Sequence, residues 1–369
     1  MVLQAFCLMK GLARVRHVVL LLVCIGAVAF SHHPVVAVAA EGESEVTANG
    51  DPEVFATIAT DTGWEGWTCD ELTPDLCSSD ELDVSTGELV VRGGIRLRYW
   101  RYTSRHQRNT SKNTNSTSSN SNASQPLPVI VLHGGPGWPH DYLLPLRQQA
   151  CRGREVIFYD QAGCGQSSSL SPEKNMSSVT HFPWLIDPSY YATEELPALI
   201  SHLGLDRYHL LGHSWGTILA QLFALDTEKG EIRNGLASMI LSGPLSDAKL
   251  YVQAQWDPEE GNLGGLPPFL QDRIRFLQTK HAYESNSNQT LSDEYAALDN
   301  VLTSFFTCRT APAPDCLTRA SNNANRQIYV GMQGPSEFSL SGTLGTLNTT
   351  GRLGELGKQL PVLLTSGKF

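Results

Sequence analysis

Ten residues at positions 208–217, YHLLGHSWGT, say the most about how this chain folds and works. A short apolar run leads into a serine between Gly212 and Gly216, at G-x-S-x-G spacing, and an apolar helical pattern begins at Thr217. This spacing indicates a nucleophile when it lies between a buried strand and a helix. Glycines permit the tight turn between the two elements, and the serine hydroxyl then projects above the sheet. We therefore predict that Ser214 is a nucleophile; the alternative is an ordinary β–α turn that contains a serine.

The sequence around this motif alternates between expected strands and expected helices. Short apolar runs predict buried strands at 128–132 (PVIVL), 155–159 (EVIFY), 208–211 and 237–241. Helical patterns fall between them, at 142–150, 190–203 and 217–225, and Pro197 is expected to bend or interrupt the second. Continuous apolar strands separated by helices indicate a mostly parallel sheet with helices on both faces, so the predicted fold class is α/β. A hairpin is expected at 88–102, around Gly93 and Gly94.

The alternation ends near residue 245, which divides the chain into regions. Residues 86–245 are predicted to form the core, interrupted at 104–125 by a Ser/Asn-rich insertion that is too polar to be buried. Residues 246–358 carry helical patterns at 269–280 and 291–306, separated by Pro, Gly and Asn, which predicts an inserted helical cap. Strand character returns in LPVLL at 360–364, so 359–369 is expected to begin the C-terminal part of the core, with its last strands missing.

The N-terminal region points to the secretory pathway. Residues 1–40 contain basic residues, then an apolar run, then small residues at A-x-A spacing, which is the order of a secretory signal peptide. An uncleaved signal anchor is the alternative, and residues 41–85 form an acidic extension. We expect the protein to be secreted or to lie in the lumen of the secretory pathway, without stable membrane association. The net charge of −10 argues against nucleic-acid and anionic-membrane partners.

The cysteines and the sequons bear on the same compartment. Six cysteines lie outside the predicted signal peptide, and two local disulfides, Cys69–Cys77 and Cys308–Cys316, are the simplest pairing in an oxidising environment. No histidine lies beside these cysteines at zinc-ligand spacing, so no metal site is expected. Sequons of the N-x-S/T type are compatible with a glycoprotein and begin at Asn109, Asn115, Asn122, Asn175, Asn288 and Asn348.

A second motif, HGGPG at 133–137, follows the strand expected at 128–132. Glycines there let the backbone approach a reacting carbonyl, so an N–H of this loop and the N–H of Trp215 could together form an oxyanion hole. We favour Gly135 as the donor from the loop. No lysine follows, as a phosphate-binding P-loop would require, and His133 is expected to be structural rather than the catalytic base.

A third motif, DQAGCGQS at 160–167, ends the strand expected at 155–159, and its Asp160 is as consistent with a structural role as with a functional one. Together with HGGPG, GHSWGT and GMQGPSEF at 331–338, it resembles the motif set of the prolyl aminopeptidases (proline iminopeptidases) of the α/β-hydrolase superfamily. The resemblance covers roughly residues 86–369. It implies the α/β-hydrolase fold with an inserted cap.

The resemblance also implies roles for single residues. Ser214 would be the nucleophile, served by the two oxyanion donors named above. Glu337 takes the place of an acidic cap residue that binds the free α-amine of the substrate, because a carboxylate in a closed pocket pairs with an ammonium group and rejects blocked peptides. Otherwise Glu337 is a surface glutamate. Cys164 matches a cysteine frequent in the family and is expected to be a buried free thiol, which would leave Cys151 unpaired as well.

The other members of a catalytic triad do not follow Ser214 in the expected order. An α/β hydrolase orders its triad as Ser, then Asp or Glu, then His. The only histidine after Ser214 is His281, inside the predicted cap, and the chain ends at Phe369 soon after a strand that resembles the family's approach to the acid. We expect the acid and the histidine to lie beyond residue 369, and this chain to be an inactive fragment.

The predicted function is that of a serine aminopeptidase without metal or organic cofactor. It would release an N-terminal residue, preferably proline, from short peptides with a free N-terminus, through an acyl-enzyme on Ser214. Two alternatives stay open: an esterase or other α/β hydrolase, and a non-catalytic secreted hydrolase-like protein. The oligomeric state is not predicted.

Overall fold

The computed structural model describes the chain from Cys69 onwards, with gaps. The described residues are 69, 77, 81–105, 126–167, 179–227, 231–284, 287–308, 310, 312–356, 358 and 360–366. The predicted signal peptide, most of the acidic extension and most of the Ser/Asn-rich insertion lie outside them, as do four of the six sequons: Asn109, Asn115, Asn122 and Asn175.

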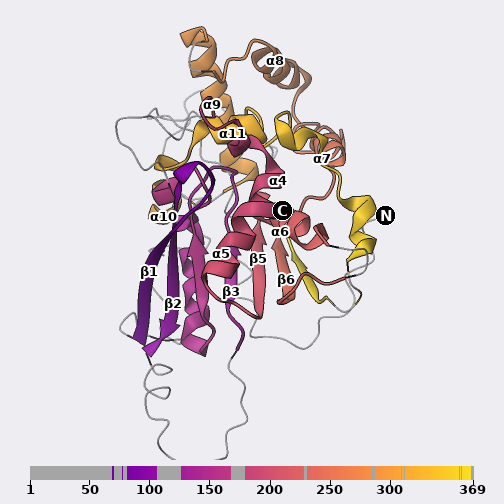
Figure 1. The fold of residues 1–369 in the computed structure, drawn as a ribbon. Coiled ribbons are helices and arrows are strands. Elements are labelled where there is room, and N and C mark those ends of the chain that lie inside the picture. Colours follow the sequence, from indigo (N-terminus) through magenta and orange to yellow (C-terminus); the bar gives the residue numbers. More distant parts are fainter. Residues whose placement is uncertain are drawn as a thin grey trace, which may run out of the picture.

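A sheet of seven strands forms the centre of the part of the chain that the structure describes, in the order β1-β2-β4-β3-β5-β6-β7 (Figure 1). The strands are β1 (Leu82–Val90), β2 (Arg96–Ser104), β3 (Val129–Leu132), β4 (Val156–Tyr159), β5 (Tyr208–His213), β6 (Leu236–Ser242) and β7 (Val362–Thr365). The expected hairpin is the antiparallel pair β1–β2, and β2 also pairs antiparallel with β4. All other neighbours pair in parallel, which confirms the predicted α/β class.

Alternate residues of the central strands face two separate apolar cores. In β3, Ile130 and Leu132 belong to one core, whereas Val129 and Val131 belong to the other. The four residues of β4 divide in the same way, and every residue of both strands is buried. Burial on both faces explains why these strands appear in the sequence as unbroken apolar runs.

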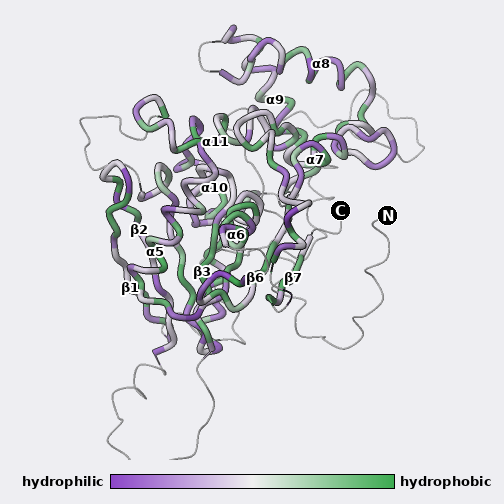
Figure 2. The backbone as a smooth tube through the Cα atoms, turned by 45° about the vertical axis from the view of Figure 1, so that its right-hand side comes forward, coloured by the Kyte–Doolittle hydropathy of each residue, from purple (hydrophilic) through white to green (hydrophobic). Residues whose placement is uncertain are grey.

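Helices cover both faces of the sheet. The first core includes side chains from α5 (Leu196–His202) and α6 (Trp215–Leu225). The second includes side chains from the 3-10 helix η4 (His140–Arg152) and from α10 (Asp315–Asn322). Figure 2 shows α6 as a mostly hydrophobic element among the strands, as expected for a helix that is buried almost all round.

The helix expected at 190–203 is interrupted before Pro197. It consists of α4 (Pro188–Tyr190), a π-helical turn η7 (Tyr191–Glu195) and then α5, in which Pro197 occupies the first turn. Proline is tolerated in a first turn because the backbone N–H that it lacks has no intrahelical partner there.

A long excursion separates β6 from β7, and parts of it pack on the two cores of the sheet. This excursion contains α10 and the helices α7 (Ala248–Gln255), α8 (Pro268–Thr279), α9 (Gln289–Phe306) and α11 (Arg326–Met332), with the 3-10 turns η8 (Thr343–Thr346) and η9 (Thr350–Glu355). Its two ends meet, because the N–H of Thr349 donates a 2.7 Å hydrogen bond to the carbonyl of Ser246. At its far side, the Asn325 N–H donates a 2.8 Å bond to the carbonyl of Gly137, so α11 begins directly above the loop after β3 (Figure 1).

Within the described residues, no helix combines the length and apolar character that a membrane crossing requires.

The disulfides differ from the expected pairs. Cys69 is bonded to Cys316 with the Cα atoms 5.7 Å apart, and Cys77 is bonded to Cys151 with the Cα atoms 5.6 Å apart. Both local pairs are therefore wrong, and so is the expectation that Cys151 is unpaired. Cys164 is a buried free cysteine, as expected.

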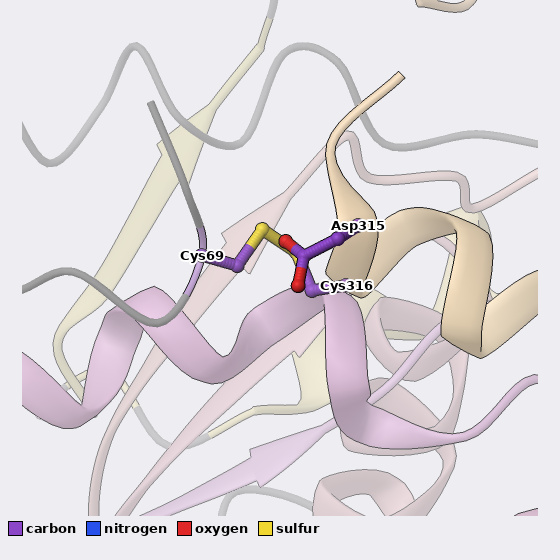
Figure 3. Close-up of side chains that lie close together, drawn as sticks. All are labelled: Cys69, Asp315 and Cys316. Atoms are coloured by element: carbon purple, nitrogen blue, oxygen red, sulfur yellow. A yellow bond between two sulfur atoms is a disulfide. The ribbon is translucent and has the colours of Figure 1, made fainter. Parts of the chain in front are cut away.

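The packing of α10 against η4 explains these long-range pairs. It brings Cys316 close to Cys69 and Cys151 close to Cys77, and the guanidinium of Arg147 in η4 donates a 2.9 Å bond to the carbonyl of Cys69. Asp315 lies beside Cys69 and Cys316 in a group with the spacing of metal ligands (Figure 3). The two sulfur atoms are bonded to each other, so neither is a thiolate that could ligate a metal.

Candidate active site

Ser214 lies at the sharp turn between β5 and α6. Its backbone has φ 51° and ψ −121°, a conformation that side-chain-bearing residues rarely adopt. Two bonds hold the turn: the Ser214 N–H donates to the carbonyl of Ser242 over 3.0 Å, and the Thr217 N–H donates to the carbonyl of Ser214 over 2.8 Å. Ser214 remains partly exposed while its neighbours are buried. Such strained positions are typical of functional sites.

The two glycines of the motif are required by close backbone contacts. A Cβ atom at Gly212 would collide with the carbonyl of Gly216, and one at Gly216 would collide with the carbonyl of Leu132 at the end of β3. Only glycine lets the start of α6 lie this close to the neighbouring strand.

The glycine loop after β3 lies against Ser214. A Cβ atom at Gly134 would come within 3.0 Å of the Ser214 Cβ. The Gly134 N–H is already engaged, because it donates a 2.5 Å bond to the hydroxyl of Tyr142. Gly135 has φ 115° and is partly exposed, unlike the buried Gly134. The loop thus presents Gly135, and α6 presents its first residue Trp215, at the same end of the sheet as the serine.

Both histidines next to these motifs are buried and hydrogen-bonded. Burial lowers the pKa of His133 to about 4, and its Nε2 accepts a 2.9 Å bond from the Gln161 N–H. Burial likewise lowers the pKa of His213 to about 4, and its Nδ1 lies 3.2 Å from the Tyr142 hydroxyl. Both rings are neutral at ordinary pH and serve local structure, as expected for His133.

Asp160 has a structural role. It is 1% exposed, and its carboxylate accepts bonds from His140 Nδ1 over 2.7 Å and from the Gln166 N–H over 2.8 Å. Burial acts to raise the pKa of Asp160, but the interactions with His140 outweigh it and the pKa is lowered. The next residue, Gln161, was not singled out from the sequence. Its buried amide contacts both His133 and Trp215.

Glu337 follows α11 in the cap and faces tyrosines. Its Oε2 accepts a 3.2 Å bond from the Tyr329 hydroxyl, and its backbone carbonyl accepts a 2.7 Å bond from the Tyr251 hydroxyl. Desolvation and the nearby Asp299 raise the pKa of Glu337 and the bond from Tyr329 lowers it, which leaves the pKa at about 7 although the residue keeps some exposure. The charge of Glu337 also acts on Tyr142 and contributes to its raised pKa. Because Tyr142 contacts Gly134, Glu337 lies within electrostatic range of the residues around Ser214.

His281 is not brought to the serine. It lies in the turn after α8, where its Nδ1 is 2.8 Å from the Tyr283 hydroxyl and 3.3 Å from the Glu284 carboxylate. In the described ranges, no histidine–carboxylate pair contacts Ser214. The arrangement therefore holds a partly exposed serine, backbone N–H groups at a helix start and in a glycine loop, and a cap carboxylate.

Comparison with known proteins agrees with the fold. The family model for the alpha/beta hydrolase fold matches residues 128–367. The proline iminopeptidase of Heyndrickxia coagulans is 37% identical over 243 residues, which are 66% of this chain and 74% of that protein. That of Clostridioides difficile (strain 630) is 35% identical over 246 residues, 65% of this chain and 73% of that protein. The crystal structure of proline iminopeptidase from Mycobacterium smegmatis superposes with a TM-score of 0.53 at 26% identity, covering 76% of this chain and 80% of that one.

Proposed function

Because the chain belongs to the proline iminopeptidase family of the α/β-hydrolase fold, we propose that it is a serine aminopeptidase that releases an N-terminal residue, preferably proline, from short peptides. The observation that carries the proposal is the backbone of Ser214, held at φ 51° between β5 and α6 with the glycine loop packed against it. A serine placed this way can attack a carbonyl that enters from the cap side.

In the proposed reaction, the Ser214 oxygen attacks the carbonyl carbon of the first residue and forms a tetrahedral intermediate. Its oxyanion accepts hydrogen bonds from the N–H groups of Gly135 and Trp215. The engagement of the Gly134 N–H by Tyr142 supports Gly135 as the donor from the loop. Collapse of the intermediate breaks the C–N bond, releases the shortened peptide as an amine and leaves an ester on Ser214, which water hydrolyses.

We assign no general base. The reaction requires a group that takes the serine proton and returns it to the leaving amine. His133 and His213 are buried and engaged with other partners, and His281 contacts Tyr283 in the cap.

Glu337 is proposed to bind the free α-amine of the substrate. Its carboxylate borders the region of Tyr142, and its pKa of about 7 means that it is largely ionised at slightly alkaline pH. A substrate ammonium group would favour the ionised form further, whereas a blocked N-terminus would leave the carboxylate unpaired in a partly desolvated position. This accounts for removal of residues one at a time from the free end.

We also propose that the protein is secreted or lumenal. The two disulfides support this, because such bonds persist in oxidising compartments.

The test uses the full-length protein, with the acid and the histidine that are expected beyond residue 369. Its hydrolysis of a prolyl coumarinyl amide is measured, with Ser214→Ala as the inactive control. We expect turnover of the free substrate and at least ~100-fold less turnover of its N-acetyl analogue, since an unmatched buried charge opposes binding. Equal turnover of both substrates contradicts the role of Glu337. Rapid ester hydrolysis without amide hydrolysis indicates an esterase, and failure of a fluorophosphonate to label Ser214 in the folded protein indicates a non-catalytic one.

A further inference from the structure

We propose that Gln161 is a positioning residue that joins the two halves of the oxyanion hole, holding the glycine loop after β3 and the residue after Ser214 in one arrangement. This role rests on the proposed function, because it concerns the two backbone donors that the proposed reaction uses.

The carboxamide of Gln161 makes one bond to each half. Its Nε2 donates to the carbonyl of His133 over 3.1 Å, and its Oε1 accepts from the indole Nε1 of Trp215 over 2.7 Å. Gln161 and Trp215 are each 2% exposed, so water does not compete for these bonds. The carboxamide is suited to this position because it offers a donor and an acceptor on one rigid planar group.

The contact with His133 fixes a peptide plane of the glycine loop. The carbonyl of His133 and the N–H of Gly134 belong to the same peptide group, which Gln161 holds at its oxygen and Tyr142 holds at its nitrogen. A peptide group is planar, so two bonds at opposite ends determine its orientation.

The backbone of Gln161 acts on the next peptide group through the His133 ring. The Gln161 N–H donates to His133 Nε2 over 2.9 Å, so the ring proton lies on Nδ1, which is 3.0 Å from the carbonyl of Gly134. That carbonyl shares its peptide group with the N–H of Gly135. Because C=O and N–H point in opposite directions across a trans peptide group, the bond to the carbonyl directs the Gly135 N–H to the other side, away from the His133 ring.

Trp215 is held at the other end of the bridge. Its indole bond to Gln161 restrains the side chain of the first residue of α6, whose N–H is the second proposed donor. Without Gln161, the loop and the helix start would keep their packing and the bridge through Tyr142, but would lose the bridge through the carboxamide. An oxyanion hole stabilises the transition state only when its donors are already aligned, so a loosened link lowers kcat rather than substrate affinity.

The experiment compares Gln161→Leu with Gln221→Leu. Gln221 is also a glutamine that is 2% exposed, and its amide makes three bonds within the fold, to the carbonyls of Thr217 and Leu245 and from the Thr349 hydroxyl. Both variants lose a buried amide, so both are expected to unfold at lower temperature. Only Gln161→Leu is expected to lower kcat, by about 10- to 100-fold with KM changed less than about 3-fold, since complete loss of one oxyanion donor costs ~100- to 1,000-fold.

Gln161→Glu provides a second readout that does not depend on how well the leucine variant folds. Its ionised carboxylate can accept from Trp215 but cannot donate to the carbonyl of His133. Protonation restores a donor, so the activity of Gln161→Glu relative to the unsubstituted protein is expected to rise as the pH falls. A purely structural role predicts no such rise.

Two results overturn the proposal: a kcat for Gln161→Leu that equals that of Gln221→Leu, or a pH-independent activity ratio for Gln161→Glu. The rate of fluorophosphonate labelling of Ser214 is measured for every variant in parallel. If the unsubstituted protein is labelled but does not cleave prolyl amides, the proposed aminopeptidase function fails, while the labelling rates still test Gln161.

Discussion

The hydroxyl of Tyr329 donates a 3.2 Å hydrogen bond to the carboxylate of Glu337. This bond lowers the pKa of Glu337, while burial and Asp299 raise it, and the balance stands at about 7. A cap carboxylate that titrates near neutrality changes its charge within about one pH unit of 7. That property separates its binding role from a structural one.

For Glu337, we expect KM for a prolyl coumarinyl amide to rise as the pH falls below about 7, because the carboxyl group is then protonated and no longer pairs with the substrate ammonium group. Glu337→Gln should raise KM by about 10- to 100-fold at pH values above 7, the loss expected for one charge-assisted bond, and should remove its pH dependence. Steady-state kinetics between pH 5.5 and 8.5 measures both effects. Glu259→Gln, at an exposed cap position, is the control; a similar rise in that variant would argue against the role.

For Ser214, replacement by glycine should stabilise the fold relative to replacement by alanine. Alanine keeps the unfavourable backbone at φ 51°, whereas glycine adopts it without steric cost. We expect the free energy of unfolding of Ser214→Gly to be about 1 kcal/mol higher than that of Ser214→Ala. Relief of the backbone strain stabilises the glycine variant by about 1–3 kcal/mol, and the greater entropy of glycine in the unfolded chain offsets part of this gain. Urea titrations of the two inactive variants make the comparison. A less stable glycine variant would show that the turn carries no strain.

Glu195 is a buried carboxylate that makes the stability of the fold depend on pH. It is 0% exposed and accepts a 3.1 Å bond from the Ala162 N–H, and desolvation raises its pKa from 4.5 to about 8. The folded protein therefore binds this proton more tightly than the unfolded chain. The resulting stabilisation is complete below pH 4.5 and is lost as the pH rises towards 8.

Glu195→Gln should remove the loss of stability that Glu195 causes as the pH rises, because glutamine keeps an acceptor for the Ala162 N–H and carries no charge. Its free energy of unfolding relative to the unsubstituted protein should rise between pH 5 and pH 8 by on the order of a few kcal/mol. Thermal or urea unfolding across this pH range is the measurement. The matched control is Glu194→Gln at the neighbouring exposed position, which should show no such trend. Parallel pH profiles for the two variants would contradict the assignment.

The disulfide pairing predicts which cysteine variants behave alike. Cys69→Ser, Cys316→Ser and their double variant should lose the same stability, about 2–4 kcal/mol, because each removes the same bond. The same equality should hold for Cys77 and Cys151. Mass spectrometry of a non-reduced digest should find the peptides of Cys69 and Cys316 linked. Linkage of Cys69 to Cys77 would contradict the structure.

Local patterns in the sequence were sufficient for the core. The strands at β3 and β4 were predictable because burial on both faces leaves an unbroken apolar run. The Ser214 turn was predictable because the spacing of its two glycines around the serine marks a tight strand-to-helix turn. The disulfides were not predictable, since Cys69 finds Cys316 only after α10 has packed against η4. Gln161 was missed for the same reason. Its partner Trp215 lies 54 positions away, and nothing in its own motif points to that contact.

The order in which the cysteines are synthesised does not favour the disulfide pairs of the folded protein. The partner of Cys77, Cys151, lies 74 positions later in the chain, and the partner of Cys69, Cys316, lies 247 positions later. Cys69 and Cys77 lie only eight positions from each other. In an oxidising compartment, a bond between Cys69 and Cys77 is the one that the growing chain can close first. Thiol–disulfide exchange must then open it before Cys316 of α10 can form its bond with Cys69. Biosynthesis of this protein should therefore depend on a disulfide isomerase, even though just two such bonds link the residues that the structure describes.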